Sequence, residues 1–277
     1  MRNLARIFAL LIVCSLTTGC ITSTTLVKVK ADGSGLVEQT LSMRKEAADD
    51  LQKMIGSFAG TDTAASANTG ELFSEADLRK AAARMGEGVT FVSSRAISAP
   101  DRVGRTAIYA FTDVTKLHVD EKPSTPRPEG AQMPMGSGRA EAIRFAMSHL
   151  PNGHSLLTVV FPQSKSEKED VDVKPAQKSS SQQPSPEQME MIKKMFDGLK
   201  ISMSVEPQGT VVKTSSPYVA ANRVTLFEMD FTELLTNDAV LQQIGQPASL
   251  EDAKALLKNI KGFKVNLDRE ITVEFAP

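Results

Sequence analysis

Residues 26–43 have the sequence Leu-Val-Lys-Val-Lys-Ala-Asp-Gly-Ser-Gly-Leu-Val-Glu-Gln-Thr-Leu-Ser-Met. The first five favour a strand, residues 32–35 (Asp-Gly-Ser-Gly) are a strong turn sequence, and apolar side chains then alternate from Val37 to Met43. Two strand-like runs joined by a glycine-rich turn are typical of a β-hairpin. The segment therefore predicts an antiparallel strand pair, which a short polar tether at residues 21–25 precedes.

The same order of elements occurs twice along the chain: a hairpin, a helix and two more strands. Both copies end in the motif Asp-x-Thr-x-Leu, which begins at Asp113 in the first copy and at Asp230 in the second. The motif begins 80 residues after the turn at Gly33 and 78 residues after the turn at Asn152. This agreement favours two copies of one ββ-α-ββ unit, and chance agreement of common elements is the alternative. We expect the Asp or Thr of the motif to cap a short helical turn.

These patterns predict an α+β fold of two units, residues 20–118 and residues 141–277, each an antiparallel sheet with helices on one face. A Pro/Gly-rich loop at residues 119–140 separates the units. Residues 163–184 are almost purely polar and charged, which predicts a long disordered insert in the second unit.

Helical periodicity and capping residues predict a helix that stops at Gly86 in the first unit. In the second unit they predict helices at residues 185–199 and 249–262. Apolar residues then occupy odd positions from 263 to 275. This alternation predicts one long strand, or two strands with a turn near Asp268.

The N-terminus has the pattern of an export signal. Two arginines precede an apolar run at residues 7–14, which is too short to span a membrane. Residues 16–20 (Leu-Thr-Thr-Gly-Cys) then resemble the lipobox of bacterial lipoproteins, although the usual Leu three places before the Cys is Thr17 here. We therefore expect a signal peptide at residues 1–19 and lipidation of Cys20. An ordinary signal peptide that is cut nearby, with an incidental Cys20, is the alternative.

Lipidation of Cys20 would make a membrane the first partner of the protein. Each buried CH₂ contributes about 0.8 kcal/mol, so two or more acyl chains, such as palmitate, hold a protein stably on a bilayer. Residue 21 is Ile rather than Asp. In the lipoprotein family this implies the outer membrane where the cell has one, and otherwise the outer face of the cytoplasmic membrane.

The lipobox, the Val-rich strand, the turn at residues 32–35 and the strand after it resemble the LppM-like domains of bacterial lipoproteins, as does the Asp-x-Thr-x-Leu ending. The resemblance covers about residues 20–43 and the ending. It implies an α+β domain that faces away from a membrane, and it brings no catalytic residues.

Composition argues against several classes of function. The chain has 277 residues, a net charge of −1 and a pI near 6.4, which argues against a strongly basic nucleic-acid binder. Aromatic residues are only 5% of the chain and Trp is absent, which argues against base stacking. Two cysteines, one of them within the signal, cannot build a disulfide scaffold.

The histidines are the first candidates for chemistry. His149 and His154 flank the turn at residues 151–153, but no Cys, Asp or Glu in that hairpin supplies a third metal ligand. We therefore predict surface histidines and no metal site. His118 has no evident partner for catalysis, and no catalytic motif or phosphate-binding loop occurs. No catalytic residue and no cofactor is predicted.

Methionine is the other candidate. Met133 and Met135 form one M-x-M pair, Met189 and Met191 form another, and Met195 follows one helical turn later. Thioethers bind Cu(I), so copper handling is one interpretation, and ordinary core packing is the other.

The leading interpretation is a non-enzymatic, lipid-anchored envelope protein whose domain binds a partner protein, a lipid or a wall component. The alternatives are an enzyme with a carboxylate site that no motif announces, and copper handling. Convergent carboxylates with strongly perturbed pKa values would favour the enzyme.

Overall fold

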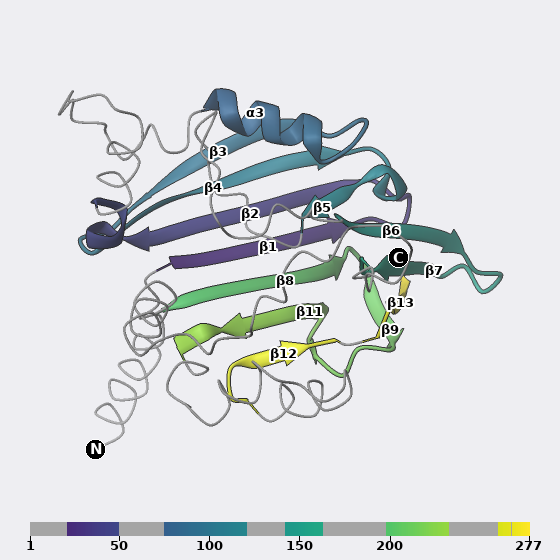
Figure 1. The fold of residues 1–277 in the computed structure, drawn as a ribbon. Helices are drawn as coiled ribbons and strands as arrows, with labels where there is room; N and C mark the ends of the chain where they lie inside the picture. Colours follow the sequence, from purple (N-terminus) through teal and green to yellow (C-terminus); the bar gives the residue numbers. More distant parts are fainter. Residues whose placement is uncertain (1–20, 50–74, 121–141, 163–197, 233–259, 267) are drawn as a thin grey trace, which may run out of the picture.

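Two β-sheets form most of the described part of the chain (Figure 1). The computed structural model describes residues 21–49, 75–120, 142–162, 198–232, 260–266 and 268–277. Its elements are β1 (Ile21–Val29), β2 (Gly35–Arg44), α3 (Glu75–Arg84), β3 (Thr90–Ser98), β4 (Arg102–Phe111), the 3₁₀ turn η2 (Val114–Lys116), β5 (His118–Asp120), β6 (Ala142–His149), β7 (Ser155–Val160), β8 (Leu199–Pro207), β9 (Thr210–Thr214), β10 (Val219–Ala220), β11 (Arg223–Asp230), β12 (Phe263–Val265) and β13 (Glu270–Ala276).

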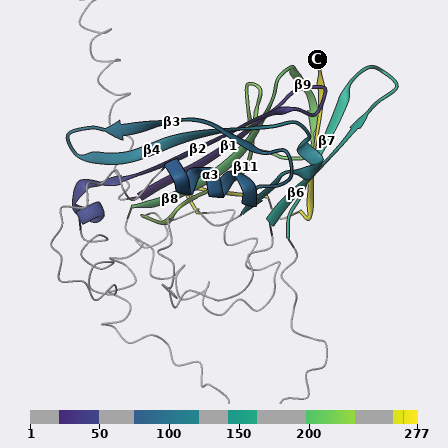
Figure 2. The same cartoon turned by 90° about the horizontal axis from the view of Figure 1, so that it is seen from above.

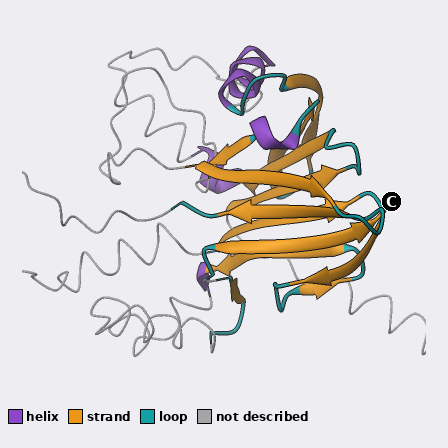
Figure 3. Ribbon diagram, turned by 90° about the vertical axis from the view of Figure 1, so that its right-hand side faces the viewer, coloured by secondary structure: helices purple, strands orange, loops and turns teal. Residues whose placement is uncertain are grey.

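The larger sheet has the strand order β10-β11-β8-β1-β2-β4-β3, with β12 paired to β11. The smaller sheet has the order β5-β6-β7-β13-β9. Strands dominate and the described helices are short, so the fold is mainly β or α+β (Figure 3).

The predicted hairpin is confirmed, because β1 and β2 pair antiparallel along the whole of β1. The backbone N–H and the hydroxyl of Ser34 both donate to Asp32 Oδ1, at 2.9 and 2.7 Å, and so fix the turn. The polar tether predicted at residues 21–25 is wrong, because β1 already begins at Ile21. Three of these five residues are Thr, whose β-branched side chain suits a strand as well as an exposed position.

Strands from the two predicted units share the larger sheet. The first-copy strands β1, β2, β4 and β3 are neighbours in this sheet. The second-copy strand β8 pairs parallel with β1, and β11 pairs antiparallel with β8. The second-copy strands β10 and β12 also join the larger sheet, whereas β6, β7, β9 and β13 belong to the smaller sheet. Two separate ββ-α-ββ units, each with its own antiparallel sheet, are therefore not confirmed.

One continuous core cluster contains residues of both sheets, including Val27 and Tyr109 of the larger and Leu157 and Phe275 of the smaller. The larger sheet turns the odd-numbered side of β1, with Val27 and Val29, toward this core. Helix α3 packs on the core through Leu78 and Ala82, and Figure 2 shows it along one side of the sheet. We call this side of the sheet the inner face and the other side the outer face.

The apolar alternation from 263 to 275 belongs to two strands, as the alternative prediction had it. β12 joins the larger sheet and β13 the smaller. Between them the side-chain amide of Asn266 donates to the carbonyls of Thr225 and Leu226, both at 2.8 Å. These bonds fix the point at which the chain leaves one sheet for the other.

The predicted cap at the Asp-x-Thr-x-Leu motif is confirmed in the first copy. Asp113 precedes η2 and accepts hydrogen bonds from the backbone N–H and the hydroxyl of Thr115, at 2.9 and 2.7 Å. In the second copy Asp230 accepts from the backbone N–H of Thr232 at 3.1 Å. The local turn chemistry is thus shared by the two copies.

Several predictions fall on residues outside the described part of the chain and stay predictions. They are the signal peptide 1–19 with Cys20, the insert 163–184, most of the helices at 185–199 and 249–262, and the methionine pairs. The loop 119–140 also lies outside, apart from its first two residues, which belong to β5. No helix among the described residues is long and apolar enough to cross a membrane.

Candidate functional site

A row of hydroxyl groups crosses the outer face of the larger sheet. Ser202, Thr24, Thr40 and Thr106 occupy neighbouring register positions on β8, β1, β2 and β4, and we call them the hydroxyl row. Ser202 Oγ donates to Thr24 Oγ1 at 3.4 Å, and the hydroxyls of Thr40 and Thr106 lie 3.0 Å apart. The row forms because Thr24 lies on the outward, even-numbered side of β1 and its register partners Thr40 and Ser202 also carry hydroxyls.

Charged residues continue the row on both sides. Glu228 on β11 is the register partner of Ser202, and Lys264 Nζ donates to its carboxylate at 2.7 Å. Arg95 on β3 is the register partner of Thr106 at the opposite edge. The row therefore runs across the sheet from the Glu228–Lys264 ion pair at one end to the exposed Arg95 at the other.

A second polar set lies next to the hydroxyl row, toward the start of β1. Arg102 Nη2 donates to Thr22 Oγ1 at 3.1 Å and to Ser42 Oγ at 3.2 Å, so one guanidinium links three strands. Ser42 pairs with Gly104. A Cβ at Gly104 would meet the carbonyl oxygen of Leu41, so only glycine fits at this position.

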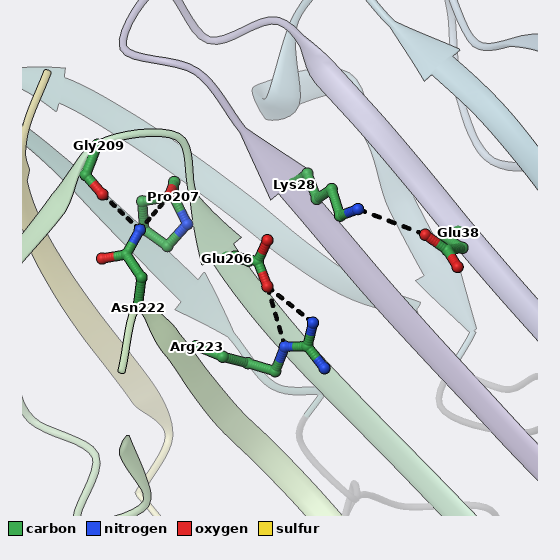
Figure 4. Close-up of polar contacts among 7 residues, drawn as sticks. All are labelled: Lys28, Glu38, Glu206, Pro207, Gly209, Asn222 and Arg223. Atoms are coloured by element: carbon green, nitrogen blue, oxygen red, sulfur yellow. Dashed lines mark hydrogen bonds and ion pairs between the residues drawn. The ribbon is translucent and has the colours of Figure 1, made fainter. Parts of the chain in front are cut away.

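The opposite end of the outer face carries a charged ladder (Figure 4). Arg223 donates through Nε and Nη2 to Glu206 Oε2, at 3.0 and 2.8 Å. Glu206 is the register partner of Lys28, whose Nζ lies 3.4 Å from Glu38 Oε2. Two acids and two bases thus alternate over four neighbouring positions.

Asn222 lies beside this ladder and has a structural role. Its side-chain amide donates to the carbonyls of Pro207 and Gly209, and its Oδ1 accepts from the backbone N–H of Val211 at 2.8 Å. The preceding residue, Ala221, has a positive φ of 51°. Asn222 therefore holds together the turns that end β8 and precede β11.

The two candidate histidines make separate contacts in the smaller sheet. His154 Nδ1 lies 2.7 Å from Glu274 Oε1, and Asn152 Nδ2 donates to the same oxygen at 3.2 Å. His149 Nδ1 instead lies 3.3 Å from the hydroxyl of Ser155, which is buried. Among the described residues, no group of three or more His, Cys, Asp or Glu side chains is placed to hold a metal ion.

Sequence reasoning missed Glu274 because it is 120 residues away from His154. The two meet only because β13 pairs with β7, which places Glu274 opposite Leu156. No signal short of the strand order could have found this pair.

Within the described part of the chain, three carboxylates have a pKa shifted clearly from its ordinary value, and all three shifts are downward. The hydrogen bond from His154 holds the pKa of Glu274 below its usual range. The side-chain hydrogen bonds from Ser34 and Thr115 do the same for Asp32 and Asp113. These three groups are therefore stabilised as carboxylates and fix turns or strand pairs, which is the opposite of what a general acid needs.

Comparison with known proteins gives one weak likeness. No protein family profile matches the chain, and no curated protein sequence matches it. Among solved structures, the NMR structure of the folded domain of the LppM protein of Mycobacterium tuberculosis aligns with a TM-score of 0.32 and 8% sequence identity, over 93% of this chain and 90% of that chain. At this identity and TM-score the likeness assigns no function.

Proposed function

We propose that the chain is a lipid-anchored protein of the cell envelope whose β-rich domain is a non-enzymatic binding or structural module. Cys20 is the lipidation site and the membrane is the first partner. The second partner is an envelope protein or wall component that docks on polar surface. The location is the outer membrane where the cell has one, and otherwise the outer face of the cytoplasmic membrane.

The start of the fold supports this proposal. β1 begins at Ile21, and the first buried core residue among those described is Leu26. Cleavage before Cys20 would therefore remove none of the described strands or core residues. A processed chain keeps both sheets and gains an acylated first residue directly before the first strand.

The outer face supports the binding part. Its central strands present hydroxyls and paired charges, which form hydrogen bonds with a polar partner more readily than they perform acid–base chemistry. The three carboxylates with lowered pKa values are also committed to turns and strand pairs. A binding module agrees with these features better than a carboxylate enzyme does.

Metabolic labelling with an alkyne fatty acid tests the anchor. The wild-type chain should take up label and sediment with membranes, and Cys20→Ala should lose the label and either stay uncleaved or become soluble. Cys14→Ala is the matched control, because it removes the other cysteine, which lies in the apolar run of the signal. A wild-type chain that takes no label and fractionates as soluble would show that the lipobox interpretation is wrong.

A further inference from the structure

We propose that the end of the larger sheet at which β1 begins lies against the membrane, so that the strands stand away from the bilayer. This inference rests on the proposed lipidation of Cys20. It adds an interaction surface, made of described residues, and its partner, the headgroup layer of the bilayer that holds the acyl chains.

The length of chain between anchor and fold carries the inference. After cleavage before Cys20, only that residue precedes β1. Ile21 is already fixed in the sheet, because its backbone N–H donates to the carbonyl of Gly198 at 3.3 Å and it has register partners on both β2 and β8. Consecutive Cα atoms are about 3.8 Å apart. An acylated Cys20 therefore has no slack, and Ile21 must lie at the level of the headgroups.

The neighbours of Ile21 define the surface. β2 ends beside it at Arg44, and the helical turn after β2 is fixed because Ala48 is fully buried against Met43. The β3–β4 loop lies at the same end, where the carbonyl of Asp101 accepts from the backbone N–H of Lys45 at 3.0 Å. Lys45, Pro100 and Asp101 are exposed there. Figure 1 shows the starts of β1 and β8 and the β3–β4 connection on the same side of the molecule.

The smaller sheet lies at the opposite end. The hydroxyl of Ser155 donates to the carbonyl of Ala31, in the β1–β2 turn, at 3.4 Å, so this turn contacts the β6–β7 hairpin. A strand rises about 3.3 Å per residue, so the nine residues of β1 separate its two ends by about 26 Å. The connection between β6 and β7 lies farther still from the start of β1 (Figure 1).

A sheet that lies flat on the bilayer is the competing orientation. The outer face offers charged ladders and hydroxyls, which would lose hydration without inserting apolar surface. The exposed large apolar side chains of the described residues are Val92, Val212 and Val219, on β3, β9 and β10 at the margins of the sheets. Among the described residues, the central strands of the outer face carry no large, exposed apolar side chain that could insert into the bilayer.

Depth-dependent fluorescence quenching tests the orientation. In the full chain, processed in cells, a newly introduced Cys is the only free thiol, because Cys14 leaves with the signal and Cys20 is acylated. Pro100→Cys marks the anchored end, Arg95→Cys marks the middle of the edge strand β3, and Pro151→Cys marks the far end. All three positions are exposed. Each protein is labelled with a fluorophore at the introduced Cys and reconstituted in phosphatidylcholine–phosphatidylglycerol vesicles. These vesicles contain a lipid with a nitroxide quencher on its headgroup.

We expect quenching at Pro100→Cys to be several-fold stronger than at Pro151→Cys, with Arg95→Cys between them. Insertion of a twelve-residue Gly-Ser tether between Cys20 and Ile21, with an r.m.s. length of about 19 Å, should leave acylation intact and abolish this order. Equal quenching at all three positions, or the strongest quenching at Arg95→Cys, would overturn the orientation. Failure of the anchor itself is distinguishable, because none of the variants would then carry fatty acid or remain on the vesicles.

Discussion

Phe275→Ala is the substitution that best tests whether the two sheets share one core. Phe275 lies on β13, two residues from the end of the chain, yet its side chain is fully buried. Its register partners are Ser155 on β7 and Val211 on β9, and it belongs to the same cluster as Val27 of the larger sheet. Truncation to Ala leaves a cavity at the junction of the two sheets.

The expected loss is large. Phe→Ala at a fully buried site lowers the free energy of unfolding by about 3–5 kcal/mol. Domains are stable by about 5–15 kcal/mol, so this change removes a large share of the total. For a chain of this size, about 2–4 °C of melting temperature is lost per kcal/mol, which predicts a decrease of about 6–20 °C.

Urea denaturation followed by circular dichroism measures the loss, and hydrogen exchange with mass spectrometry locates it. Peptides from β2 in the larger sheet and from β7 in the smaller sheet should lose protection by the same amount, because one core unfolds as one unit. Val212→Ala is the control on neighbouring β9, where the side chain is 53% exposed, and it should change stability by no more than about 0.5 kcal/mol. If β7 loses protection while β2 keeps it, the sheets unfold separately, and the reasoning from a shared core fails.

Two further substitutions test the polar contacts and the close strand packing. The lowered pKa of Glu274 means that its carboxylate stabilises the fold at pH values above its ordinary pKa of 4.5, and that this effect is lost as the pH falls through the folded pKa. Glu274→Gln should therefore melt at a lower temperature than wild type at pH 7 and approach the wild-type melting temperature at pH 3. An equal difference at both pH values would exclude a role for the charge. Gly104→Ala should prevent normal folding, because its Cβ would meet the backbone of β2, whereas Gly153→Ala, with open space and a φ of 82°, should cost only about 1–2 kcal/mol. Thermal melts of the two glycine variants give the comparison, and equal losses would contradict the steric argument.

Local chemistry made part of the fold predictable. The hairpin at residues 26–43 depends on a turn that closes through Asp32 and Ser34, two residues apart, so its signal lies within a few positions. The Asp-x-Thr cap is equally local, and both of its copies form the hydrogen bond that the motif predicts. Alternation from 263 to 275 likewise identified four buried side chains, those of Phe263, Ile271, Val273 and Phe275, although not the sheet that each joins.

Strand partners were not predictable in the same way. The parallel pairing of β1 with β8 joins residues such as Thr24 and Ser202, which are 178 positions apart. The near-equal spacings in the two copies suggested separate sheets, yet the copies differ in what their turns contact. The carbonyl of Gly33 accepts from the backbone N–H of Val114 at 2.8 Å, next to the first motif, whereas Asn152 contacts Glu274 of the smaller sheet. Near-equal spacing indicates the order of elements along the chain, whereas side-chain packing decides which strands pair.

The hydroxyl row has two physical explanations, and its contacts separate them. A half-exposed face of a central strand favours Thr for its β-branched shape alone, and this would leave the hydroxyls independent of one another. Here Ser202 bonds to Thr24, Thr40 bonds to Thr106, and Arg102 fixes the neighbouring Thr22 and Ser42. Side chains that are already held by their neighbours lose less conformational entropy when a partner binds. These polar side chains of the outer face are therefore preorganised. Preorganisation lowers the entropy cost of binding a partner, and contact with water alone does not require it.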